Sequence, residues 1–77
     1  MNYALIMQWQ RGTMAEQVAA DLASQIKNGK LSKWDSLPLN RTLAATYDVS
    51  ERTISKAKNL LDYHGLLLMD GNRYYVA

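Results

Sequence analysis

The sequence predicts a mainly α-helical domain with a small β-hairpin, namely a winged helix-turn-helix with a three-helix core and a two-stranded wing. Two observations predict this fold class. Apolar residues recur at helical spacing in three segments, and the last segment is followed by two short apolar runs around Asp70-Gly71. A tight turn separates the second segment from the third. Helix, connector, short helix, turn, helix and hairpin, in this order, form the winged-helix arrangement.

The composition is that of one small folded domain. With 77 residues, 48% of them apolar, the chain can form a single core, and the absence of cysteine excludes disulfides and thiolate metal sites. The apolar runs YALIM and LLLM are too short to cross a bilayer, and basic residues are nearly absent near the N-terminus. We therefore expect a cytoplasmic protein with no membrane partner. The net charge of +2 permits an anionic partner without requiring one, so only the placement of charge is informative.

The first helix is predicted to begin after Thr13, whose side chain can cap it, with Glu16 completing a capping box three residues later. The helix should end at Asn28-Gly29, a typical helix stop. Its apolar residues at helical spacing are Ala15, Val18, Ala19, Leu22, Ala23 and Ile26.

The segment MNYALIMQWQ before this helix is apolar and aromatic, and its pattern fits a short strand or an arm that docks elsewhere. Its alternating residues Tyr3, Leu5, Met7 and Trp9 either extend a small core or form a dimer contact. We therefore divide the chain into a lead-in segment, residues 1–12, and a winged-helix domain, residues 13–77.

A polar connector, KLSKWDSLP, leads to the second helix. Its tryptophan, Trp34, is expected to cover the core beside the wing. Asn40 is a candidate cap for the short helix RTLAATY, and Asp48 marks the end of that helix. The apolar side of the helix consists of Leu43, Ala44 and Tyr47.

The third helix should be capped by Ser50 and end at His64-Gly65. Its buried side would contain Thr53, Ile54, Ala57 and Leu61, and its exposed side Arg52, Ser55, Lys56, Asn59 and Tyr63. Arginine can bind guanine, and asparagine adenine, through two hydrogen bonds each, whereas a lysine such as Lys56 suits a phosphate. The hydroxyls and amides of the first turn could also meet a phosphate. The exposed side is therefore a candidate DNA-reading surface.

The segment LLLMDGNRYYV predicts the hairpin, because Asp-Gly and Gly-Asn pairs supply the positive φ angles of a tight turn. Tyr74 and Tyr75 alternate in the second strand, so one should pack on the core and the other face outward. Asn72 and Arg73 stand at this turn and at the start of the second strand.

Residues 18–76 resemble the N-terminal winged-helix domain of GntR-type bacterial transcription regulators. The matching segments are ASQIKNGKL, LPLNRTLAATYDVS, RTISKA and LLDYHGLLL, in uninterrupted order and spacing. The family phrases run Ile-x-x-Gly, Leu-Pro-Ser-x-Arg-x-Leu-Ala and Val-Ser-Arg-x-Thr-Val-Arg. The resemblance implies a transcription regulator that binds double-stranded DNA, with the third helix in the major groove and a homodimer on the DNA.

The resemblance also implies roles for individual residues. Arg41 matches an arginine that contacts DNA phosphates in the family, Ser50 matches the serine of the turn, and Thr53 matches a threonine that meets the DNA backbone. Asp70 and Gly71 fall at the wing tip, which enters the minor groove in family members, so Asn72 and Arg73 would reach toward the minor groove from the wing.

Several positions depart from the family pattern. Glu51 and Ser55 stand where the family has two arginines that often read guanine, so the target sequence or the affinity should differ. Arg52 and Lys56, each one residue further on, are candidates to compensate. Trp34 replaces a usual glycine, Leu39 replaces the serine after the proline, and the short wing lacks the usual second glycine.

Family members continue into an effector-binding and dimerisation domain, whereas this sequence ends at Ala77. A complete small protein, which the lead-in segment favours, would lack ligand sensing or take it from a partner. An excised domain would have lost its sensing half. In both cases we expect no small-molecule effector site within these residues.

The alternative function is protein–protein docking by the winged helix without specific DNA binding, which the two missing arginines favour. An enzyme is not expected. The only histidine, His64, lies at a helix end where it should face solvent, and no carboxylate pair or nucleophile beside a base is evident. The glycines match no phosphate-binding loop, and no metal or cofactor is implied.

Overall fold

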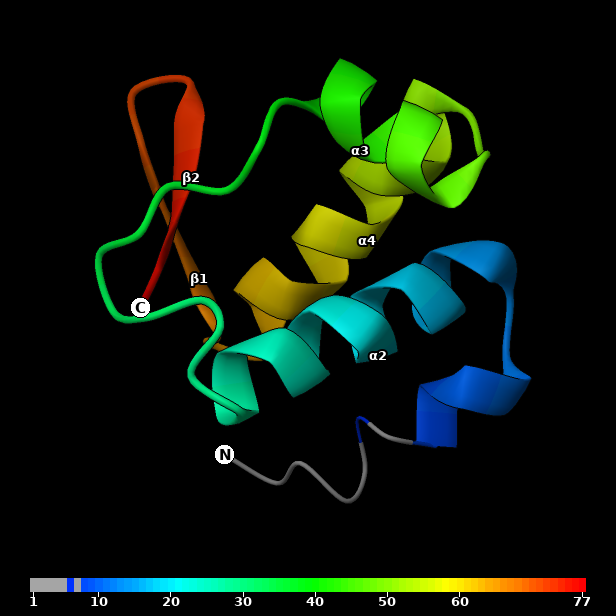
Figure 1. The fold of residues 1–77 in the computed structure, drawn as a ribbon, viewed down its shortest axis with the longest axis horizontal. Helices are drawn as coiled ribbons and strands as arrows, with labels where there is room; N and C mark the ends of the chain where they lie inside the picture. Colours follow the sequence, from blue (N-terminus) through cyan, green and yellow to red (C-terminus); the bar gives the residue numbers. More distant parts are fainter. Residues whose placement is uncertain (1–5, 7) are drawn as a thin grey trace.

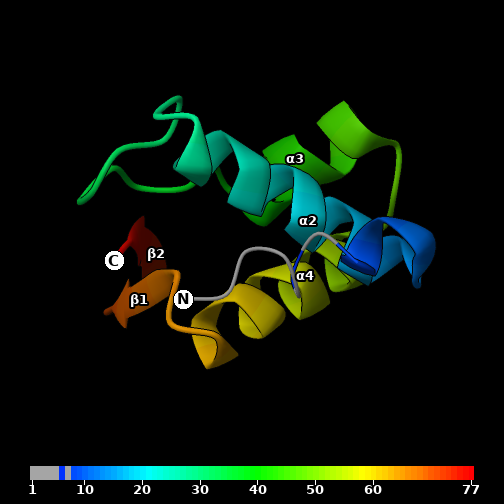
Figure 2. The same cartoon turned by 90° about the horizontal axis from the view of Figure 1, so that it is seen from below.

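The computed structural model describes residues 6 and 8–77, which form three α-helices and an antiparallel hairpin around one core (Figure 1). The elements are η1 (Gln8–Arg11), α2 (Met14–Lys27), α3 (Asn40–Tyr47), α4 (Glu51–Tyr63), β1 (Leu67–Asp70) and β2 (Arg73–Val76). Helix α4 runs through the middle of the molecule, with α3 beside its start and the hairpin beyond its end (Figures 1 and 2). This arrangement confirms the predicted winged helix-turn-helix.

Two helices begin at the predicted caps. The Thr13 hydroxyl accepts a hydrogen bond from the Glu16 amide at 3.2 Å, and the Glu16 carboxylate accepts one from the Thr13 amide at 2.8 Å. The Ser50 hydroxyl accepts a bond from the Thr53 amide at 3.1 Å. The chain leaves α2 at Gly29 and α4 at Gly65 with φ angles of +81° and +79°, which glycine adopts without steric cost.

The start of α3 differs from the prediction. Asn40 is already the first helical residue, and Leu39 takes the cap position, where its carbonyl accepts a bond from the Leu43 amide at 3.0 Å. The prediction that Asn40 caps this helix was wrong. Leucine has no side-chain oxygen, so α3 begins without a side-chain cap bond. The replacement of the family's serine at this position is the physical reason.

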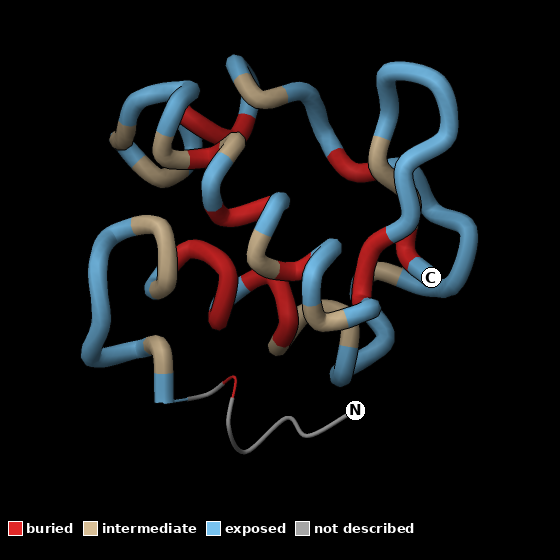
Figure 3. The backbone as a smooth tube through the Cα atoms, turned by 180° about the vertical axis from the view of Figure 1, so that it is seen from behind, coloured by how far each residue is buried: buried red, intermediate tan, exposed pale blue. Residues whose placement is uncertain are grey.

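The core lies where α2, α4 and the base of the hairpin face one another (Figure 3). Helix α3 and the connector also contribute to it, and its buried side chains are Val18, Ala19, Leu22, Ala23, Leu37, Leu43, Ala44, Ile54, Ala57, Leu61, Leu66, Leu67 and Val76. The apolar periodicity of the sequence therefore identified most of the buried positions.

Part of the lead-in segment also belongs to this core. Ile6 is fully buried in it, and Trp9 packs against it. The Trp9 ring and the Tyr63 ring each meet the His64 ring edge-on, at centroid distances of 5.0 Å and 5.2 Å. His64 is therefore half-buried, and the expectation that it faces solvent was wrong. For Trp9, core packing is the interpretation that the structure supports; the positions of Tyr3, Leu5 and Met7 lie outside the described residues.

The hairpin pairs Leu67 with Val76 and Asp70 with Arg73 across a two-residue turn. The turn begins at Gly71, whose φ of +64° is typical of the first position of a type II′ turn. As predicted, the two wing tyrosines alternate: Tyr74 packs against the core, and Tyr75 lies on the opposite face of the strand.

The connector between α2 and α3 runs beside β2 and forms an isolated antiparallel bridge to it, between Ser36 and Tyr75 (Figure 1). The Trp34 amide donates to the Val76 carbonyl, and the Val76 amide donates to the Asp35 carbonyl, both at 2.9 Å. The Trp34 side chain is 63% exposed and does not cover the core, so that prediction was wrong. The Trp34 φ angle of +75° is the left-handed conformation that suits the glycine of the family pattern.

Candidate nucleic-acid interface

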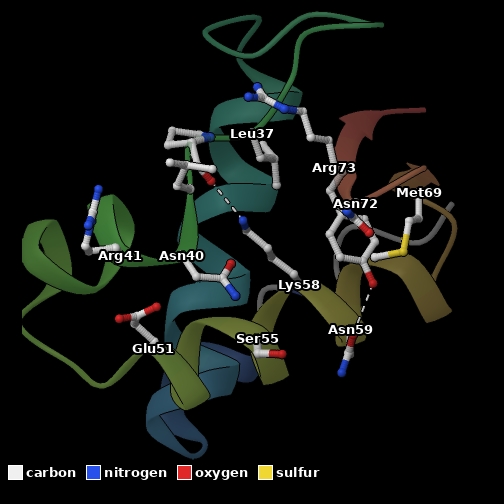
Figure 4. A pocket seen from close by; sticks show the side chains of 13 residues that line it. Leu37, Asn40, Arg41, Glu51, Ser55, Lys58, Asn59, Met69, Asn72 and Arg73 are labelled. Carbon is white, nitrogen blue, oxygen red and sulfur yellow. Dashed lines mark hydrogen bonds between the residues drawn. The ribbon is translucent and has the colours of Figure 1, made fainter.

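A groove opens between the segment that enters α3, the exposed face of α4 and the hairpin (Figure 4). We call it the α4 groove. It is lined by Leu37, Pro38, Leu39, Asn40, Arg41, Glu51, Ser55, Lys58, Asn59, Met69, Asn72, Arg73 and Tyr74. Glu51, Ser55 and Asn59 are spaced four apart on α4, so they form one strip along its face.

Half of the predicted contact residues line this groove: Arg41, Ser55, Asn59, Asn72 and Arg73. Arg41 and Arg73 are exposed and lie at opposite ends of the groove, with the polar strip of α4 between them (Figure 4). Two arginine side chains therefore lie on either side of the polar strip of α4, whose side chains can donate and accept hydrogen bonds.

The other predicted α4 contacts lie on a neighbouring face. Arg52 and Lys56 are exposed and spaced four apart, so they share a second strip, turned by about 100° from the groove strip. Lys56 lines a shallow depression that also includes Glu16 and Tyr63. The two positions that carry arginine in the family pattern face the groove, whereas Arg52 and Lys56 do not line it.

The remaining predicted contacts lie at the two ends of this surface. Ser50 and Thr53 sit in the first turn of α4, with their hydroxyl oxygens 3.0 Å apart. Gly71 is exposed at the wing tip, and a side chain added there would meet no atom within 4 Å. The backbone at Gly71 is therefore open to a close approach by a partner.

Lys58 is a groove residue that the sequence analysis did not identify. It is 6% exposed, and its ammonium donates a hydrogen bond to the Pro38 carbonyl at 2.8 Å (Figure 4). Burial lowers the pKa of Lys58. The bond joins α4 to the segment before α3 and so fixes one wall of the groove. A signal was present, because Lys58 lies on the apolar stripe of α4, between Ile54 and Leu61.

The hairpin wall is joined to α4 through Tyr74. Its hydroxyl lies 3.0 Å from the Asn59 amide oxygen and 3.2 Å from an Asp62 carboxylate oxygen. Burial, followed by the hydrogen bond to Asp62 and its negative charge, raises the pKa of Tyr74. The phenol is thus a donor at neutral pH.

Helix α3 is held against α2 by a third polar contact. The Tyr47 hydroxyl donates to the Asp21 carboxylate, and the Gln25 amide donates to the Tyr47 oxygen at 3.3 Å. Burial is the main cause that raises the pKa of Tyr47, and the Asp21 carboxylate adds to it. This contact positions α3, and with it Arg41.

These features define a class of protein. A second and third helix joined by a tight turn, with a polar strip on the third helix and a hairpin beside it, form a winged helix-turn-helix domain. Residues 14–73 match the bacterial regulatory proteins of the gntR family, and the chain belongs to that family. The family consists of regulators and not of enzymes.

Three similar proteins illustrate the match. YydK of Bacillus subtilis (strain 168), an uncharacterized HTH-type transcriptional regulator, is 35% identical over 52 residues, which are 68% of this chain and 22% of YydK. YtrA of Sulfolobus acidocaldarius, a GntR-family transcription factor, has a TM-score of 0.81 at 32% identity, over 86% of this chain and 70% of that one. The DNA-binding domain of AraR, in complex with operator ORX1, has a TM-score of 0.79 at 32% identity, over 84% and 80% of the two chains.

Proposed function

We propose that this domain binds double-stranded DNA sequence-specifically, as a bacterial transcription regulator of GntR type that forms a homodimer on its site. The α4 groove is the observation that supports this best, because the polar strip of α4 lies between Arg41 and Arg73. The similarity to a domain of AraR in complex with its operator supports the same function. The proposal places the protein in the cytoplasm, where bacterial DNA is; among the described residues, no helix is long and apolar enough to span a membrane.

In the proposed complex, α4 lies in the major groove. Ser55 and Asn59, on the groove strip, would meet base edges. Arg52 and Lys56, on the neighbouring strip, would meet base edges or the phosphates at the flank. Glu51 also faces the groove, where its carboxylate would repel a phosphate and could accept from a cytosine amine.

The ends of the surface would bind the DNA backbone and the minor groove. Arg41 would contact phosphates from α3, and Ser50 and Thr53 would do so from the first turn of α4, where the helix dipole favours negative charge. The wing, through Gly71, Asn72 and Arg73, would reach the minor groove. The proposal includes no metal, cofactor or effector site within these residues.

The test is selection of bound duplexes from a random-sequence library, at about 50 and about 200 mM salt. The expected result is enrichment of a palindrome whose half-sites lie about one helical turn apart, as two-fold symmetry requires. Binding without enrichment would contradict sequence specificity, and enrichment of a single half-site would contradict the homodimer.

Two substitutions test the division of roles. Arg41→Ala should weaken binding to all sequences alike and reduce the slope of log K against log salt by about 0.9, because one phosphate contact is lost. Asn59→Ala should leave that slope unchanged and relax preference at one base pair by about 1–3 kcal/mol. Arg52→Ala should relax preference if it reads a base. Identical behaviour of the variants would contradict separate backbone and base roles.

Protein–protein docking is the second candidate function. An apolar patch of Trp34, Leu68 and Met69, which are 63%, 44% and 50% exposed, favours it. Leu68 and Met69 belong to the wing strand β1, and Met69 also lines the α4 groove, so a docking partner on this patch would contact the wing itself. Failure to bind any duplex at low salt would support docking over the proposed function.

A further inference from the structure

The Tyr74 hydroxyl contacts Asn59, a side chain that is predicted to read a base. Tyr74 belongs to β2, and its ring packs against the core, so its hydroxyl is held by the hairpin and not by α4. That hydroxyl lies 3.0 Å from Oδ1 of Asn59, which is exposed on the groove strip of α4. The Asp62 carboxylate, one turn further along α4, lies 3.2 Å from the same hydroxyl, so the two acceptors share its single proton.

The contact decides which end of the Asn59 amide faces outward. An asparagine side chain has an acceptor end, Oδ1, and a donor end, Nδ2. Because Oδ1 is directed to the phenol, Nδ2 lies on the opposite side of the amide and points away from the hairpin (Figure 4). In the major groove, an amine can donate to guanine N7 and O6, adenine N7 or thymine O4, whereas cytosine presents only a donor.

We propose that Tyr74 is a positioning residue that fixes Asn59 with its amide nitrogen toward the DNA, so that α4 selects a base presenting a hydrogen-bond acceptor at this position. The inference rests on the proposed function and adds a specificity determinant outside the third helix. Tyr74 itself touches no base. A side chain that is already oriented loses less conformational freedom on binding, so the preference should be sharper than that of a free asparagine.

The experiment compares duplex selection for the natural chain, Tyr74→Phe, Asn59→Ala and the double variant, with Tyr75→Phe as the matched control on the opposite face of β2. Asn59→Ala identifies the base pair that depends on Asn59. At that pair the natural chain should favour an acceptor-bearing base over cytosine by roughly tenfold or more. Tyr74→Phe should remove most of that preference and leave the other positions and the salt slope unchanged.

Two further readouts separate positioning from a structural role. In the Asn59→Ala background, Tyr74→Phe should have no additional effect on base preference, because the side chain it orients is absent. Asp62→Ala should keep the preference, since it removes the competing acceptor and the phenol then donates to Asn59 alone. A merely structural role would lower affinity for all sequences alike, and would do so in the Asn59→Ala background as well.

Three results would overturn the inference: unchanged base preference in Tyr74→Phe, an equal change in Tyr75→Phe, or enrichment of cytosine at the Asn59-dependent position. The last result would mean that the amide presents its oxygen to the DNA. These outcomes differ from a failure of the proposed function, in which the natural chain itself would select no sequence.

Discussion

At the scale of single residues, Lys58 gives the clearest stability prediction. Its stem is buried, and its ammonium satisfies the Pro38 carbonyl at 2.8 Å. Lys58→Ala removes this bond and leaves the carbonyl without its partner, so we expect a loss of about 1–3 kcal/mol in the free energy of unfolding. Lys56→Ala, at an exposed position two residues earlier, should change it by less than about 0.5 kcal/mol. Urea denaturation measures both, and equal losses would contradict the structural role of Lys58.

The raised pKa of Tyr47 predicts a loss of stability at alkaline pH. The unfolded chain releases this proton near the ordinary pKa of 10.0, whereas the folded chain retains it to higher pH. The stability that Tyr47 contributes is therefore complete below that pKa and is lost as pH rises toward the folded value. The raised pKa of Tyr74 likewise lowers the free energy of unfolding as pH rises. The lowered pKa of Lys58 has the opposite effect: the folded chain releases that proton at lower pH than the unfolded chain, so this contribution to stability increases as pH rises.

Comparison of variants isolates the Tyr47 contribution from the others. Unfolding free energies measured at about pH 8 and about pH 11 should fall less for Tyr47→Phe than for the natural chain. Tyr63→Phe, at a position that is 86% exposed, serves as the control and should follow the natural chain. A steeper fall for Tyr47→Phe would contradict the assigned direction of the shift.

At the scale of elements, the connector between α2 and α3 contains a strained position, in the turn before its bridge to β2. Trp34 has a φ of +75°, which costs a residue with a β-carbon about 1–2 kcal/mol relative to glycine. Trp34→Gly and Trp34→Ala both remove the ring and its contact with the Lys33 ammonium, 5.6 Å from the ring centroid. The glycine variant should be the more stable by about 1 kcal/mol in thermal or urea unfolding. If Trp34→Ala were instead more stable than Trp34→Gly, the backbone at position 34 would not be left-handed.

The elements were largely predictable because their signals are local. Helical periodicity together with the caps at Thr13 and Ser50 placed α2 and α4, and Gly71 placed the turn of the hairpin. The start of α3 was misplaced because a backbone carbonyl, at Leu39, begins the helix without any side-chain signal. The pairing of the connector with β2 depends on hydrogen bonds between residues far apart in sequence, as between Trp34 and Val76, and no local sequence pattern indicates those bonds.

For the candidate site, the sequence predicted which types of residue α4 exposes, but not how those residues are arranged around the groove. The exposed side of α4 was identified, but its division into two strips depends on where the hairpin and α3 pack. Ser55 and Asn59 therefore line the groove, and Arg52 and Lys56 do not. Lys58 was missed because a lysine is seldom buried, although it stands on an apolar stripe. The partnership of Tyr74 with Asn59 joins two elements and becomes visible only in three dimensions.

At the scale of the whole molecule, the division at residue 12 is open to a direct test. Ile6 is fully buried in the core, and Trp9 packs against the same core, so this part of the lead-in should stabilise the domain. Ile6→Ala removes buried methyl groups and should lower the free energy of unfolding by about 2–5 kcal/mol. Gln8→Ala, at an exposed position two residues later, should have almost no effect.

The same variants separate the scaffold from the proposed DNA site. Ile6 does not line the α4 groove, so Ile6→Ala should leave the affinity of the folded domain for its selected duplex unchanged. The measurement is a DNA titration at low temperature, under conditions where circular dichroism shows the variant to be folded. Equal stability of Ile6→Ala and Gln8→Ala would mean that residues 1–12 are a separate segment. A loss of affinity in the folded variant would instead mean that the lead-in shapes the DNA-binding surface, because a change in the core would then have reached the groove.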